Sequence, residues 1–185
     1  MSVAVCNVIH LPTWMIEHAK AEAADVFRAV DVDIRWTSCG SELREQDPHM
    51  RPDFIIRVLA GGHANKGGPA SLETMGQAFL GAGGAGYLAD AYYGAIREIT
   101  LLYKSAGGDQ VLAFTMAHEL GHLLIGPGHG SDGIMRANWS REELDALSRN
   151  RLKFNKAQRA AILRNLRSRA AGPDAAPAPG VAVQR

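Results

Sequence analysis

Hydrophobic and polar positions follow two alternating periods in the first part of the chain. Apolar side chains fill both alternating sets of positions from Val3 to Ile9, which is typical of a strand covered on both faces. After Pro12 and Thr13, apolar residues recur at helical spacing as far as Val30 and predict an amphipathic helix. The stretch from Val32 to Trp36 alternates again, with one more polar face. This order predicts a βαβ unit.

The middle of the chain has a weaker pattern. Residues 40–52 are polar and contain two prolines, which predicts a loop, and residues 53–59 (DFIIRVL) predict a third strand. Between Gly61 and Gly86, nine of 26 residues are glycine, so we expect an open loop or a backbone that closely approaches another group. A strand from Tyr87 to Tyr93 would border this segment. As the sheet edge it would bind an extended peptide by strand addition, and a surface hairpin is the alternative.

A helical period returns at about Asp109. One apolar stripe faces the core and a neighbouring stripe carries two histidines, and the helix is predicted to end at Gly126. Ser140 with Glu143 then forms a capping box for another helix. The same device, Asn155 with Gln158, begins a last helix that runs to about residue 169. Residues 170–185 lack periodicity and contain three prolines, which predicts a disordered tail.

The composition is typical of one globular domain, which we place at residues 1–169. The order of predicted strands and helices assigns this domain to the α/β (α+β) class. The 185 residues are 46% hydrophobic and 21% charged, enough to bury a substantial core. The net charge of +1 gives no reason to expect a nucleic acid or an anionic membrane as a partner. We read the basic residues of the last helix as a solvated face. Neither substrate nor oligomeric state follows from these numbers.

The N-terminus shows no signal peptide, and no apolar run is long enough to span a bilayer. A complete chain would therefore be expected in the cytoplasm, whereas a mature form of a longer chain would be compatible with secretion. The two cysteines, Cys6 and Cys39, cannot form a disulfide framework. We expect buried free thiols, because strand cysteines are commonly small core residues, with a single disulfide between strand ends as the alternative.

Candidate chemistry is concentrated in residues 118–135, HELGHLLIGPGHGSDGIM. His118 and His122 are four residues apart, so on a helix both imidazoles project from one face and form a chelating pair. Glu119 would lie beside a metal there, where a carboxylate takes a proton from water. His129 offers a third nitrogen, and a catalytic zinc site needs three protein ligands and one open position. Asp132 is the alternative third ligand.

This stretch resembles the signature of the metzincin zinc peptidases, HExxHxxGxxH followed by a methionine turn. The resemblance implies a metzincin-like fold, with a small twisted mixed sheet, a backing helix, a site helix and C-terminal helices. It also implies that His118, His122 and His129 bind zinc, that Glu119 is the general base and that Met135 lies beneath the metal. The segment GIMRANW and the helices predicted after it also resemble small bacterial proteins with a HELGHLL motif.

The sequence departs from that signature by one inserted residue. Gly126 follows His122 by four positions and His129 follows it by seven, one more than in the family pattern. Because Gly126 and Gly128 have backbone conformations open to them that other residues rarely adopt, the loop can still deliver His129. Glu142 would replace it in a second topology, similar to thermolysin, in which a glutamate on the next helix is the third ligand.

We therefore expect a zinc-dependent endopeptidase with a peptide or protein substrate bound extended near residues 77–93. One alternative is an inactive relative that binds peptides without cleaving them. Another is a metal-dependent endoribonuclease, although the glutamate after the first histidine argues against that class. Four further histidines have no partner at chelating spacing and are not expected to bind a metal: His10, His18, His49 and His63. Tyr92 and Tyr93 are expected to pack in a strand.

Overall fold

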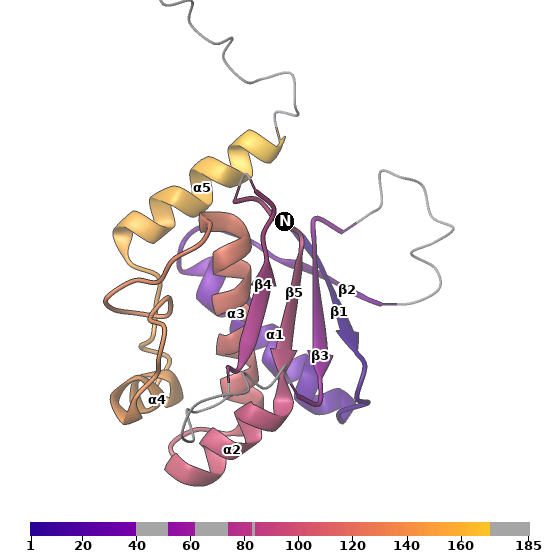
Figure 1. The fold of residues 1–185 in the computed structure, drawn as a ribbon, viewed down its shortest axis with the longest axis vertical. Coiled ribbons are helices and arrows are strands. Elements are labelled where there is room, and N and C mark those ends of the chain that lie inside the picture. Colours follow the sequence, from indigo (N-terminus) through magenta and orange to yellow (C-terminus); the bar gives the residue numbers. More distant parts are fainter. Residues whose placement is uncertain (40–51, 62–73, 83, 171–185) are drawn as a thin grey trace, which may run out of the picture.

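The predicted strand, helix and strand at the N-terminus form a parallel βαβ unit in the computed structural model, which describes residues 1–39, 52–61, 74–82 and 84–170. A five-stranded sheet lies against helices, as Figure 1 shows. The elements in chain order are β1 (Ser2–Asn7), α1 (Thr13–Arg28), β2 (Arg35–Ser38), β3 (Phe54–Leu59), β4 (Gly76–Phe79), β5 (Leu88–Tyr92), α2 (Tyr93–Tyr103), α3 (Gly108–Ile125), α4 (Arg141–Ser148) and α5 (Lys156–Ala170).

The sheet is mixed, as expected, in the order β2-β1-β3-β5-β4. Neighbouring strands from β2 to β5 are parallel, and only β4 is antiparallel, pairing Gly76 with Ala91 and Phe79 with Leu88. The strand predicted at 87–93 is therefore internal, so the condition for strand addition to it, that it forms the sheet edge, is not met. The edge is β4, which lies in the glycine-rich segment where we expected either an open loop or a backbone that closely approaches another group. Its short sequence, GQAF, contains no β-branched residue that would have indicated a strand.

The core lies between one face of the sheet and helices α1 and α3. Phe54, Ile56 and Val58 point from β3 into this layer and are fully buried. Helix α3 contacts α1, α2, α4, α5, β4 and β5, so every residue from Val111 to Leu124 is buried. The separate core stripe and site stripe expected for this helix therefore merge, because it is enclosed on all sides.

The two predicted capping boxes are confirmed. The Ser140 amide donates to Glu143 Oε2 over 2.7 Å, and the Asn155 and Gln158 side chains each accept from the other residue's amide over 2.9 Å. Helix α2 was not anticipated, although Ala95, Ile96 and Ile99 recur at helical spacing. Residues 171–185, predicted as a tail, lie outside the described residues. None of the described helices is both long and apolar enough to cross a membrane.

Cys6 and Cys39 form a disulfide, so the expectation of free thiols is wrong. The reason is the register of the parallel pair β1 and β2, in which Val5 lies opposite Ser38. The next residue on each strand is a cysteine, and their Cα atoms are 4.7 Å apart, within the usual range for a disulfide.

Candidate metal centre

His118 and His122 lie one turn apart on the buried helix α3, and their Nε2 atoms are 3.0 Å apart. The Nδ1 atom of His118 is 2.7 Å from the Ile134 carbonyl oxygen, and that of His122 is 3.2 Å from the Gly126 carbonyl oxygen. A carbonyl only accepts, so each Nδ1 carries the proton and donates it. Each Nε2 therefore presents a lone pair, and this arrangement is typical of histidines that bind a metal.

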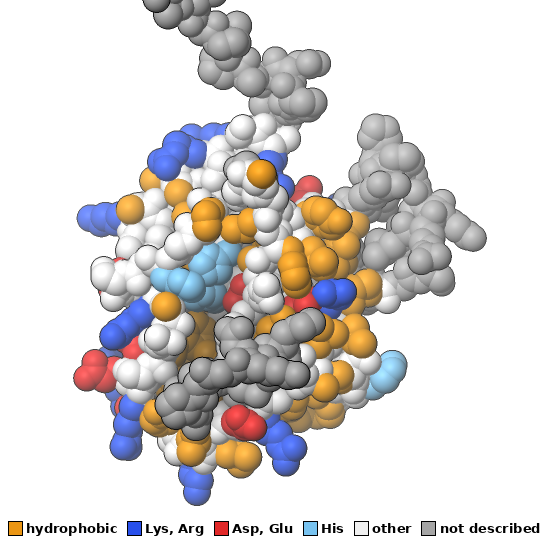
Figure 2. Space-filling view, in the orientation of Figure 1, with side chains coloured by type: hydrophobic (Ala, Val, Ile, Leu, Met, Phe, Trp, Pro, Cys, Tyr) orange, Lys and Arg blue, Asp and Glu red, His pale blue; other side chains and the backbone are white. Residues whose placement is uncertain are grey.

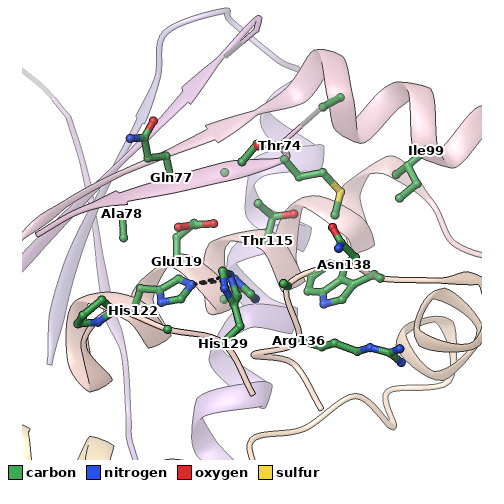
Figure 3. Close-up of a pocket in the computed structure, with 18 of the residues that line it drawn as sticks. Thr74, Gln77, Ala78, Ile99, Thr115, Glu119, His122, His129, Arg136 and Asn138 are labelled. Atoms are coloured by element: carbon green, nitrogen blue, oxygen red, sulfur yellow. Dashed lines mark hydrogen bonds between the residues drawn. The ribbon is translucent and has the colours of Figure 1, made fainter. Parts of the chain in front are cut away.

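His129 reaches the same point from the loop after α3. Gly126 and Gly128 have φ angles of 105° and 101°, so the two glycines turn the chain as the sequence predicted. The Nε2 atom of His129 lies 3.3 Å from that of His122, and one nitrogen from each of the three histidines falls within 4.8 Å of the others. His122 and His129 are labelled in Figure 3, with the His122 contacts dashed.

This donor set fits a zinc ion. Two neutral imidazoles whose lone pairs face each other at 3.0 Å repel unless a cation lies between them. Tetrahedral zinc with Zn–N bonds of about 2.0–2.1 Å places its nitrogens roughly 3.3 Å apart, close to the distances observed. Among the described residues, these histidines form the one group of three or more side chains with metal-ligand spacing. Asp132 instead accepts a hydrogen bond from Asn155, and Glu142 is exposed at the start of α4.

Glu119 lies beside the histidines and is 5% exposed. Its carboxylate lies against the edge strand, so close that a Cβ atom on Gly76 would be 2.5 Å from Glu119 Oε1. Burial raises the pKa of Glu119, a hydrogen bond from the Ala78 backbone opposes the shift, and the nearby Asp90 charge adds to it, so that the pKa is about 8. A cation at the histidines would favour the ionised carboxylate. A backbone that closely approaches another group, one of the two expectations for the glycine-rich segment, is thus found at Gly76, although Glu119 was not expected as the group it approaches.

The two helix histidines are kept neutral by burial. Burial lowers the pKa of His118, the Ile134 carbonyl opposes the shift, and the neighbouring His122 and His129 add to it, so that the pKa is about 4. The pKa of His122 is also lowered, again mainly by burial. Both rings are thus held in the form that binds a metal.

Residues 134–139 pack against helix α3 and contact the His118 side chain. Met135 is buried against Gly121 on α3, where an added Cβ would be 2.4 Å from the Met135 Sδ atom. The Trp139 ring lies 5.9 Å from the His118 ring, and its Nε1 donates to the Ile134 carbonyl over 3.3 Å. That carbonyl therefore accepts from Trp139 and from His118, which fixes the His118 ring.

A cavity of about 500 Å³ opens over the histidines and Glu119. It lies between β4, α2, α3 and residues 136–139, and Figure 2 shows the pale blue histidines grouped beside it on this face. Tyr92 and Tyr93 do not line it. Tyr92 is buried and donates to Gln77 over 3.3 Å, in line with the packing role expected.

Of the other histidines, His18 pairs with Asp109 and His10 belongs to no metal group among the described residues. His49 and His63 lie outside the described residues.

Comparison with known proteins shows which solved structure has a similar fold. No family model matches the chain, and no curated protein matches it by sequence. Its structure is similar to that of archaemetzincin from Methanopyrus kandleri, with a TM-score of 0.54 and 14% sequence identity over 90% of this chain and 94% of the other. At this identity the likeness shows the fold alone. The expected metzincin-like α/β fold is therefore confirmed.

Proposed function

We propose that this protein is a zinc-dependent peptidase that cleaves peptide bonds. The observation that carries the proposal is the convergence of three histidine nitrogens, with the Nδ1 protons of two of them donated to backbone carbonyls, beside a buried glutamate. The archaemetzincin-like fold supports it. Met135, which packs against Gly121 on the site helix, would serve as the methionine of a metzincin-like turn.

His118, His122 and His129 would bind the zinc ion. When bound, zinc supplies Lewis-acid chemistry, because it lowers the pKa of water and polarises a carbonyl oxygen. Glu119 would accept the proton of the attacking water and deliver it to the leaving amine. The contacts of its carboxylate with β4 keep the side chain at one place beside the histidines.

The substrate would lie extended along β4, within the range 77–93 predicted from the sequence. Among the described strands, β4 pairs only with β5, so its other edge is available for strand addition. Gly76, Gln77 and Ala78 line the cavity, which would place the backbone of such a peptide next to Glu119.

The test separates metal binding from proton transfer. We expect Glu119→Gln to retain one zinc ion per chain, measured by elemental analysis, and to lose hydrolysis of a quenched fluorescent peptide library by about a hundredfold or more. His122→Ala should lose the zinc itself. The matched control is Glu142→Gln, the same substitution at an exposed site, which should keep both zinc and activity. Hydrolysis by Glu119→Gln at the wild-type rate would contradict the proposed mechanism.

The same measurements test the alternatives. Wild-type protein with one zinc ion that binds library peptides and cleaves none would be a binding module. Cleavage of RNA that depends on His122, with no cleavage of peptides, would instead indicate a ribonuclease. Zinc at Glu142, shown by metal loss in Glu142→Gln, would exclude His129 as the third ligand.

A further inference from the structure

The cavity extends beyond the three histidines toward α2. Ala95, Glu98 and Ile99 line this end, because positions three and four apart share one face of a helix. Thr115 lines it from α3, three residues before His118 and therefore about 4.5 Å further along the helix axis. In the view of Figure 3, Thr115 lies between Glu119 and Ile99. We call these four residues the α2 end of the cavity.

The hydroxyl of Thr115 is a buried polar group. The residue is 2% exposed, and its Oγ1 atom forms no hydrogen bond with any described residue. A threonine inside a helix ordinarily donates to the carbonyl four residues earlier, and buried polar atoms are rarely left unpaired. A buried hydroxyl that has no partner among the described residues, on a side chain that lines a cavity, therefore points to a polar group on the ligand.

The free charge at the α2 end is negative. Glu98 is exposed at the cavity, and no described residue forms an ion pair with it. Arg136 also lines the cavity, but its guanidinium is bound to Glu143. The walls between the histidines and Glu98 include the apolar side chains of Ala95, Ile99 and Trp139. The α2 end thus combines an apolar wall, an unpaired hydroxyl and an unpaired carboxylate.

On the basis of the peptidase function proposed above, we propose that the α2 end binds a lysine or arginine side chain of the substrate, adjacent to the cleaved bond. The aliphatic part of that side chain packs on Ile99 and Trp139, as long basic side chains do on apolar surfaces. Its cationic end donates to Thr115 Oγ1 and pairs with Glu98. An aliphatic substrate side chain leaves the hydroxyl unpaired, and an acidic one is repelled by Glu98.

The experiment uses zinc-loaded protein and four peptides that differ only at one residue flanking the cleaved bond: lysine, arginine, methionine or glutamate. The flanking position is found first by mass spectrometry of cleaved library peptides. We expect kcat/KM for lysine and arginine to exceed that for methionine by about fivefold, the upper range for a partly exposed ion pair. The preference should fall with added salt. Cleavage of the methionine peptide as fast as the lysine peptide would overturn the proposal.

Variants assign the preference to residues. Glu98→Gln should abolish most of it, and Glu98→Lys should shift it toward glutamate. Arg97→Gln is the control, because Arg97 neighbours Glu98 on α2 and does not line the cavity. Thr115→Val keeps the shape of the side chain. It should lower the affinity for the lysine peptide without lowering the melting temperature, because the lost hydroxyl had no hydrogen-bond partner among the described residues. An unchanged preference in Glu98→Gln would overturn the role of Glu98.

Binding distinguishes failure of this inference from failure of the proposed function. The same four peptides are titrated into zinc-loaded Glu119→Gln, and binding is read by fluorescence anisotropy. If no peptide is cleaved by wild type but lysine and arginine peptides bind more tightly in a Glu98-dependent way, the peptidase proposal fails and the side-chain preference stands. If peptides are cleaved and bound without that preference, the inference fails and the peptidase proposal stands.

Discussion

The three histidines of the candidate metal centre are positioned in two different ways. His118 and His122 lie on a helix buried on all sides, and each ring is oriented by a backbone carbonyl. His129 is exposed on a loop that follows two glycines with positive φ, and no hydrogen bond to its Nδ1 atom is found among the described residues. The helix thus supplies a fixed pair of nitrogens, and the loop brings a third to it.

The difference shows how an inserted residue is tolerated. Within α3, an insertion would rotate one histidine by about 100° about the axis and destroy the chelating pair. In the loop, the extra residue changes only the path of the chain, which Gly126 and Gly128 can adjust. Spacing is therefore strict where geometry is helical and variable where glycines set it.

The largest expected effect compares loss of a helix histidine with loss of the loop histidine. His118→Ala should weaken zinc binding by roughly a thousandfold or more, about 4 kcal/mol. The variant loses one ligand, and His122 is then no longer half of a chelating pair held in place by the helix. His129→Ala should weaken zinc binding less, because the fixed pair remains and water can fill the position. Isothermal titration of zinc into the metal-free proteins measures both. Equal losses would mean that the loop histidine is as firmly positioned as the helix pair.

Much of this contrast could be predicted from the sequence. The helix pair follows from the spacing of His118 and His122, and the ends of α4 and α5 follow from their capping residues. His129 was proposed as the third ligand because zinc sites need three and because of a family resemblance, and its approach to the helix pair depends on backbone angles that residue type allows but does not impose.

The parts that escaped prediction depend on contacts between distant segments. Strand β4 exists because it pairs with β5, and its Gly76 is explained by Glu119, 43 residues later. The Cys6–Cys39 disulfide depends on the register of β1 and β2. The α2 end of the cavity brings Glu98 and Thr115 together from two helices, and neither residue stands out in the sequence.

The second prediction concerns pH and the buried groups of the helix in metal-free protein. The folded-state pKa of His118 is about 4, below its ordinary 6.5, so unfolding takes up a proton between these values and stability falls as pH falls. The folded-state pKa of Glu119 is about 8, above its ordinary 4.5, so its contribution rises as pH falls through that range. The two contributions oppose each other between pH 4.5 and 6.5.

The Glu119→Gln variant separates the contributions of His118 and Glu119 to the pH dependence of stability. Metal-free Glu119→Gln should lose roughly 3 kcal/mol of unfolding free energy between pH 6.5 and 4, at about 1.4 kcal/mol per pKa unit, while metal-free wild type loses much less. Urea unfolding at a series of pH values measures both curves, and NMR titration of His118 provides a direct check. Parallel curves for the two proteins would mean that Glu119 is ionised in the metal-free fold.

The smallest effect is expected in the loop, at Gly128. A Cβ atom there meets nothing within 4 Å, so Gly128→Ala changes the backbone preference at φ 101° and no packing. Strain of about 1–2 kcal/mol should weaken zinc binding by roughly tenfold, with little change in the stability of the metal-free protein, whose loop can relax. Gly61→Ala is the control, because Gly61 is equally open and has no positive φ. If Gly128→Ala bound zinc as tightly as wild type, His129 would not depend on this glycine, and the inserted residue would have to be accommodated at Gly126 alone.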